Sequence, residues 1–234
     1  MLSHPEEEKI MKIEYSYINT YSISDYIFSN KNSEIFLNLE ELKTTITSII
    51  DNLPSIIVKR FDETGWTLHI TNTKELEKIY NLDYKIEGIT DFEQKIIYIY
   101  ARKDYIYSAI MHEFGHFIDW YLGYISFDIR WENIFNTYKE IMTKDYMKKI
   151  KFSSLFADLI ENDLLNSNIA TSEAFSDIMS IYLAQLNTAI PNEYKLTKND
   201  ISYFDDLFIY MERCLLCLEY QNSPISNLTL YNYG

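Results

Sequence analysis

Cysteine is nearly missing from this chain of 234 residues, which contains only Cys214 and Cys217. So few cysteines exclude the framework of several disulfides on which small secreted domains depend, and this absence fits any cellular compartment. Because no strand–helix–strand context surrounds the pair, we interpret both as ordinary buried cysteines on one face of a helix. A redox pair or a metal site is the alternative.

Glycine and proline are also scarce, with five and four residues, which indicates few long loops. Basic residues are outnumbered by acidic ones, 21 against 35, and the formal net charge is −14. This balance, with no visible basic patch, argues against nucleic acid and anionic membrane as partners. It favours a neutral or basic peptide as substrate, although a solvated acidic surface that keeps the protein soluble accounts for most of the charge.

Long apolar runs are missing as well. No stretch reaches the ~18 residues needed to span a bilayer, so we expect no transmembrane segment. The segment Met1–Lys12 is acidic and lacks an apolar core, so no signal peptide is expected in this numbering. The protein would then act in the cytoplasm or leave the cell by another route, unless the sequence is a mature form.

Histidine is rare too, with four residues, yet two of them flank a glutamate in the segment His112-Glu113-Phe114-Gly115-His116. Residues four apart on a helix lie one above the other. Both imidazoles can therefore reach one Zn²⁺ at roughly 2.0–2.1 Å, with Glu113 placed to take a proton from the bound water. The alternative is a pair of histidines packed in a helical core.

The residues around this motif predict a buried helix. Asp104 is a suitable N-cap and Gly123 a C-terminal stop. Apolar side chains occupy most of the circumference between them, at Tyr105, Ile106, Ala109, Ile110, Phe114, Phe117, Ile118 and Tyr121. Burial of two imidazoles and a carboxylate without partners would be costly, and a bound metal removes that cost.

A zinc site with two histidines needs at least one more protein ligand and an open position for water. One large class of zinc peptidases takes a third histidine six residues after the second, and Leu122 occupies that position here. That class is therefore excluded. The remaining histidines, His4 and His69, lie far away in the N-terminal third, so a carboxylate is the expected third ligand.

Glu173 is the best candidate for this carboxylate. No lysine or arginine occurs between Phe152 and Tyr194, and a predicted helix near residues 170–185 carries only Glu173 and Asp177 as charges, one turn apart. Acids that face a core without a basic partner would have raised pKa values. Zinc supplies the missing charge if Glu173 is a ligand and Asp177 accepts the imidazole N–H of His112. The alternative is two solvated acids on an exposed helix face.

These segments resemble a known family. His-Glu-Phe-Gly-His followed by Phe117-Ile118-Asp119, and then a distant Glu-x-x-x-Asp, is similar to the catalytic domain of anthrax lethal factor and the related Pro-Pro endopeptidases. Glu-Ala-Phe-Ser-Asp is also similar to the third-ligand helix of thermolysin-like gluzincins. The resemblance covers about residues 104–183. It implies zinc ligands His112, His116 and Glu173, Glu113 as general base, and a secreted or delivered toxin.

The chain departs from this family at one position. The family keeps a tyrosine seven residues before the ligand glutamate, where its hydroxyl stabilises the oxyanion, and here that position is Asn166. Loss of one such donor typically costs ~10²–10³ in rate. Either another group supplies the donor, with Asn166 as one candidate, or this chain is a weaker catalyst than its relatives.

The pattern divides the chain near Asp104. We expect one catalytic domain, 1–234, with a mixed α/β lobe at 1–103, the active-site helix at 104–123 and a helical lobe at 124–234. Ahead of the motif the expected elements are a helix over Ser33–Leu53, strands over Ser55–Phe61 and Trp66–Thr71, a short helix over Thr73–Tyr80 and a strand over Lys95–Ala101. Behind it they are helices over Trp131–Lys149, Ser153–Leu165, Ala170–Gln185 and Asn199–Tyr220. The resemblance implies that this α+β arrangement is zincin-like.

The strand over Lys95–Ala101 lies just before the motif helix. In zinc peptidases of this architecture an edge strand beside the cleft pairs with the extended substrate, and the resemblance suggests that role here. Its periodicity fits a buried interior strand equally well. Tyr98 and Tyr100 share one face and would either line substrate subsites or simply pack.

The expected function is therefore a monomeric endopeptidase with one Zn²⁺ per chain and a peptide or protein substrate. Zinc lowers the pKa of its water and polarises the scissile carbonyl, while Glu113 moves the proton to the leaving amine. Two alternatives stay open. One is a catalytically inactive peptidase-fold module that binds a protein partner, and the other is a structural zinc or metal-free helical protein.

Overall fold

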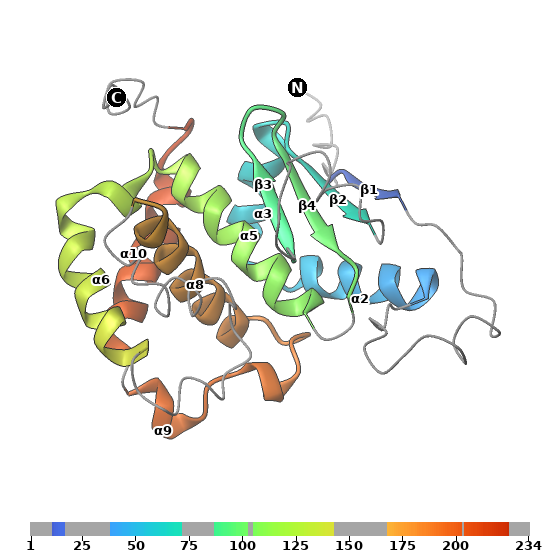
Figure 1. The fold of residues 1–234 in the computed structure, drawn as a ribbon. Helices are drawn as coiled ribbons and strands as arrows, with labels where there is room; N and C mark the ends of the chain where they lie inside the picture. The colour runs from blue at the N-terminus through green and yellow to red at the C-terminus, as the bar shows by residue number, and fades with distance from the viewer. Residues whose placement is uncertain are drawn as a thin grey trace, which may run out of the picture.

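The structure, a computed structural model, describes residues 11–16, 38–71, 87–102, 105–142, 168–202 and 204–224. Strands and helices are mixed, and the expected α+β class is confirmed (Figure 1). The strands are β1 (Ile13–Ser16), β2 (Thr67–Thr71), β3 (Gly88–Asp91) and β4 (Ile96–Tyr100). The α-helices are α2 (Leu39–Asp51), α3 (Ser55–Glu63), α5 (Ile106–Tyr121), α6 (Ile129–Met142), α8 (Asn168–Leu186), α9 (Lys198–Ile201) and α10 (Asp205–Tyr220), with 3₁₀ turns η1 (Ile125–Phe127) and η3 (Asn192–Tyr194).

The four strands form one sheet in the order β1-β2-β4-β3. Strands β1, β2 and β4 run parallel, whereas β3 is antiparallel to β4 and lies at the edge of the sheet that the described residues form. β4 is therefore paired on both sides, which agrees with the interior-strand alternative. The edge-strand role that the resemblance suggested for β4 is wrong, because its neighbours β2 and β3 already use its backbone groups.

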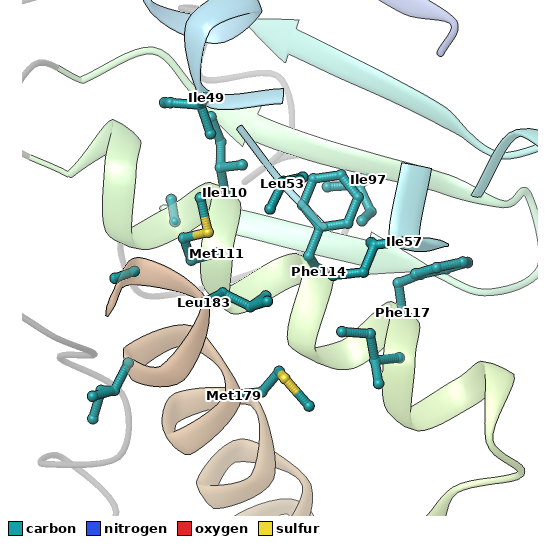
Figure 2. Packing of buried hydrophobic residues seen from close by; sticks show 14 of the residues in the cluster. Ile49, Leu53, Ile57, Ile97, Ile110, Met111, Phe114, Phe117, Met179 and Leu183 are labelled. Atoms are coloured by element: carbon teal, nitrogen blue, oxygen red, sulfur yellow. The ribbon is translucent and has the colours of Figure 1, made fainter. Parts of the chain in front are cut away.

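One face of the sheet carries the core. Because strand residues alternate between faces, Ile97 and Ile99 of β4 point together with Leu68 and Ile70 of β2, and all four are fully buried. Figure 2 shows Ile97 near Ile57 of α3 and Phe114 of α5, within a buried cluster to which α8 also contributes Met179 and Leu183. Helix α5 runs between the sheet on one side and α6, α8 and α10 on the other (Figure 1). The motif helix is thus at the junction of the two parts.

The segment predicted as a strand over Ser55–Phe61 is wrong, because it forms helix α3. Its β-branched residues favour a strand, but the buried residues are Ile57, Arg60 and Phe61, three and four apart, while Lys59 is exposed, and this spacing is helical and not that of a strand. Tertiary contacts decide the outcome. Arg60, on the same helix, is buried and donates to the carbonyls of Leu218 and Glu219 at 3.0 and 3.1 Å, at the end of α10.

The other predicted elements agree with the structure to different degrees. The strands at β2 and β4 and the helices at α2, α5, α6 and α8 are present, and the predicted parts 33–37 and 143–149 of two of these helices lie outside the described residues. The single helix expected over Asn199–Tyr220 is two helices, α9 and α10, and the short strands β1 and β3 were not expected. The predicted helices Thr73–Tyr80 and Ser153–Leu165 lie outside the described residues.

Two further expectations concern cysteine and membranes. Cys214 is buried, as expected, whereas Cys217, three residues further along α10, is exposed, so the expectation of two buried cysteines is wrong for Cys217; both thiols are free. None of the helices within the described ranges combines the length and the apolar character that crossing a membrane requires.

Candidate metal centre

Helix α5 carries the motif and is buried along most of its length. Its N-cap residue is Tyr105, which makes no side-chain capping hydrogen bond, and the expected cap Asp104 lies outside the described residues. The helix ends as predicted. Leu122 is the C-cap, and Gly123 follows with a φ of 80°, a conformation in which glycine has no steric cost.

A glycine inside the motif lets α8 approach α5 closely. A Cβ atom on Gly115 would lie 2.7 Å from Cα of Ser176 and 2.9 Å from its carbonyl oxygen, so a larger residue cannot fit without a backbone shift. Hydrophobic packing completes the contact, and Figure 2 shows Met179 and Leu183 of α8 facing α5. This close approach brings Glu173 and Asp177 on α8 next to the motif histidines.

His112, His116 and Glu173 converge on one point. Nε2 of His112 lies 3.1 Å from Nε2 of His116 and 3.0 Å from Oε2 of Glu173, and Nε2 of His116 lies 3.4 Å from Oε1 of Glu173. A tetrahedral zinc site with bonds of about 2.0–2.1 Å has ligand atoms roughly 3.3 Å apart. The donor set therefore has the chemistry and the spacing to hold a metal ion.

Asp177 fixes the orientation of His112. The carboxylate is 1% exposed, and its Oδ1 lies 2.9 Å from Nδ1 of His112. A proton on Nδ1 that is donated to this carboxylate leaves the Nε2 lone pair directed at the other two donors. The structure thus brings Asp177 to the imidazole that the sequence analysis paired it with.

A longer chain of polar groups reaches His116. Ser172 Oγ lies 3.5 Å from Nδ1 of His116, and Ser172 also acts to lower the pKa of the buried carboxyl of Asp119. Asp119 in turn accepts hydrogen bonds from the backbone N–H and the hydroxyl of Ser126, at 2.8 and 2.7 Å. Burial nevertheless raises the pKa of Asp119 to about 6. In both imidazoles, therefore, Nδ1 lies next to a side-chain oxygen, of Asp177 or Ser172, and Nε2 is directed at the point where the three donors converge.

The charges of the cluster favour a cation at its centre. Burial opposes ionisation of Glu173, but the imidazoles of His116 and His112 hold the pKa of its carboxyl below the usual range. Burial also opposes protonation of His112, yet Asp177 and Glu173 raise its pKa well above the ordinary value. Buried acids thus draw positive charge into the site, as protons on the imidazoles or as a metal ion.

Glu113 lies on the side of α5 that faces the sheet. Its carboxyl is almost fully buried, and burial raises its pKa, with His116, His112 and Thr90 opposing that rise. Oγ1 of Thr90 on β3 donates to Oε2 of Glu113 at 2.7 Å. The carboxylate is therefore adjacent to the metal donors in sequence and is held by the edge strand.

Several of these residues were missed by the sequence analysis. Thr90 and Ser172 contact site residues through space, and no local pattern marks them, whereas Asp119 was quoted only as part of the family motif and not as a site residue. Glu87, one residue before Gly88, is another. Burial raises the pKa of Glu87 to about 7, although Arg102 and His112 oppose the shift. The sequence does offer one signal for such contacts. The chain has only five glycines, and at two of them, Gly88 and Gly115, an added Cβ atom would lie within 3 Å of a neighbouring residue.

The remaining candidates are placed elsewhere. Thr90 pairs with Ile97, so Tyr98 and Tyr100, which alternate with Ile97, lie on the sheet face opposite Glu113. The ring of Tyr98 lies 5.2 Å from the ring of His69, and this placement favours the packing alternative over substrate subsites. Asn166, the possible oxyanion donor, lies outside the described residues.

Comparison with known proteins adds no assignment. The chain matches no model of a protein family, and no curated protein is similar to it in sequence.

Proposed function

We propose that the protein is a zinc-dependent endopeptidase with a zincin-like fold, similar to the lethal factor and Pro-Pro endopeptidase family. The observation that carries the proposal is the convergence of His112, His116 and Glu173 on one point, with Glu113 on the same helix. A merely structural zinc site has four protein ligands, whereas three with an open fourth position are typical of catalytic sites. The described residues offer three.

Each side chain then has a defined task. His112, His116 and Glu173 would hold the zinc ion, and Asp177 would keep His112 in the tautomer that binds it. When bound, zinc polarises a carbonyl and lowers the pKa of a water molecule toward ~7. Glu113 accepts the proton of the attacking water and returns it to the leaving amine. The oxyanion donor is not assigned, and Asn166 stays a prediction.

The extended substrate would pair with β3 instead of β4. Among the described strands β3 pairs with β4 alone, in antiparallel register, and stands at the end of the sheet order. It also contacts Glu113 through Thr90. An extended peptide added to this edge would lie beside the general base, which is the arrangement that peptide hydrolysis requires.

The test is digestion of a peptide library by purified protein with and without a chelator, alongside a Glu113→Gln variant. We expect cleavage by the wild type, none after chelation, and zinc binding without turnover in Glu113→Gln. Cleavage by Glu113→Gln at the wild-type rate would remove Glu113 as the base. The departure at Asn166 favours one alternative, an inactive module that binds a peptide, and that alternative predicts binding without cleavage by the wild type.

A further inference from the structure

The carboxylate of Glu113 fits into a notch on the edge strand β3. Thr90 forms one wall through its hydroxyl, which lies 2.7 Å from Oε2 and 3.4 Å from the backbone carbonyl of Glu113. Gly88 forms the floor, because a Cβ atom there would lie 2.7 Å from both Cγ and Oε1 and 2.9 Å from Cδ. Gly88 and Thr90 are two apart on the strand and therefore face α5 together.

We propose that Thr90 is a positioning residue for Glu113 and that Gly88 supplies the space this position needs. The inference rests on the proposed function, in which Glu113 is the general base. The hydroxyl of Thr90 donates to Oε2 and leaves Oε1 as the oxygen that accepts a proton from the attacking water. The position of Thr90 is itself fixed, because Thr90 and Gly88 of β3 pair with Ile97 and Ile99 of β4.

The residue types agree with this role. Threonine is a good strand former that also carries a donor, and its branched Cβ restricts the rotation of the hydroxyl about χ1. Valine has the same shape without the donor, whereas serine has the donor without the branch. Because Glu113 is 5% exposed, little water can replace a lost hydrogen bond, and the carboxylate must turn to find another partner.

Strand β3 would position both the peptide substrate and Glu113. If the substrate pairs with the outer edge of β3, its scissile bond is set in register with the strand that holds Glu113. Thr90 then contributes to orientation in the transition state and not to affinity for the peptide, which the backbone of β3 supplies. The expected signature is a fall in kcat with KM almost unchanged.

The experiment compares Thr90→Val, Thr90→Ser and Gly88→Ala with the wild type, each loaded with zinc. Thr67→Val is the matched control, since Thr67 is a buried threonine of the same sheet that pairs with Ile96, on the face away from Glu113. We expect kcat of Thr90→Val to fall by roughly 10- to 100-fold with KM within about twofold. Thr90→Ser should recover most of the loss, and Thr67→Val should retain the wild-type kcat.

Crystal structures of the metal-free variants supply a readout that needs no activity. In Thr90→Val and Gly88→Ala the Glu113 carboxylate should leave the notch, and in Thr90→Ser it should stay. The positioning role is overturned if Glu113 keeps its place in Thr90→Val, if kcat is unchanged, or if serine fails to rescue. If the wild type cleaves no peptide, the proposed function fails, and the position of Glu113 in these crystals still decides the inference.

Discussion

Substitution of Gly115 by alanine tests how the centre is assembled. The added Cβ would lie 2.7 Å from Cα of Ser176, and both this atom and the carbonyl oxygen at 2.9 Å belong to the backbone of α8. Carbon atoms in good contact are about 3.5–4.0 Å apart, so the two helices must separate by roughly 1 Å. Glu173 lies on the helix that moves, and the two histidines lie on the other.

The effect on stability should be small and the effect on metal binding large. Overpacking of a tight core typically costs about 1–3 kcal/mol, while alanine in place of glycine inside a helix contributes about 1 kcal/mol. The free energy of unfolding of the metal-free protein should therefore fall by roughly 0–2 kcal/mol. Zinc–ligand distances vary by only about 0.2 Å around their usual values. A separation of roughly 1 Å between the two helices that carry the ligands should therefore weaken zinc binding by at least ~10- to 100-fold.

The assay is a competition titration of zinc against a chromogenic chelator, with thermal unfolding of the metal-free protein measured alongside. Ser176→Ala is the control, because it keeps the backbone at the contact and removes a hydroxyl that is buried and has no partner among the described residues. We expect it to bind zinc like the wild type. Wild-type zinc affinity in Gly115→Ala would refute the link between the close helix approach and the metal centre.

Three further predictions concern the same framework. Asp177→Asn should weaken zinc binding by ~10- to 100-fold without change in stoichiometry, because the imidazole of His112 loses a charged acceptor, and an unchanged titration would exclude that contact. Arg60→Met should lower the free energy of unfolding by roughly 2–4 kcal/mol in denaturant titration, since the carbonyls of Leu218 and Glu219 lose a donor that is itself buried. Lys59→Met, at an exposed position, should change it by no more than about 0.5 kcal/mol, and equal effects of the two substitutions would contradict the reasoning. Zinc at 100 times its dissociation constant should raise stability by about 2.7 kcal/mol, or roughly 5–11 °C in melting temperature, and a chelator should reverse the shift; no shift would mean that zinc does not bind the folded state.

Much of the centre could be predicted from sequence because its parts are local. The spacing of His112 and His116, and that of Glu173 and Asp177, are each four residues on one helix, so each pair shares a face before any tertiary contact is known. The absence of basic residues around the second pair indicated that its partner lies elsewhere in the chain. The sequence did not show that these two helix faces meet. In the structure they meet because Gly115 lets the backbone of α8 approach α5 closely.

The parts that could not be predicted depend on contacts far apart in sequence. Thr90 contacts Glu113 across 23 positions, and its four-residue strand has no clear alternation. Segment Ser55–Glu63 has β-branched residues, yet it is a helix because its buried face packs in the core and Arg60 binds the end of α10, 158 positions away. Local propensity cannot account for either outcome.

The most direct test of the account is anomalous diffraction at the zinc edge from crystals grown with zinc. We expect one strong peak per chain, within about 2.0–2.2 Å of Nε2 of His112, Nε2 of His116 and a carboxylate oxygen of Glu173. Crystals of Glu173→Ala grown in the same way should show a much weaker peak. A wild-type crystal that lacks this peak while zinc is in excess, or that places the ion away from Glu173, would contradict the central claim.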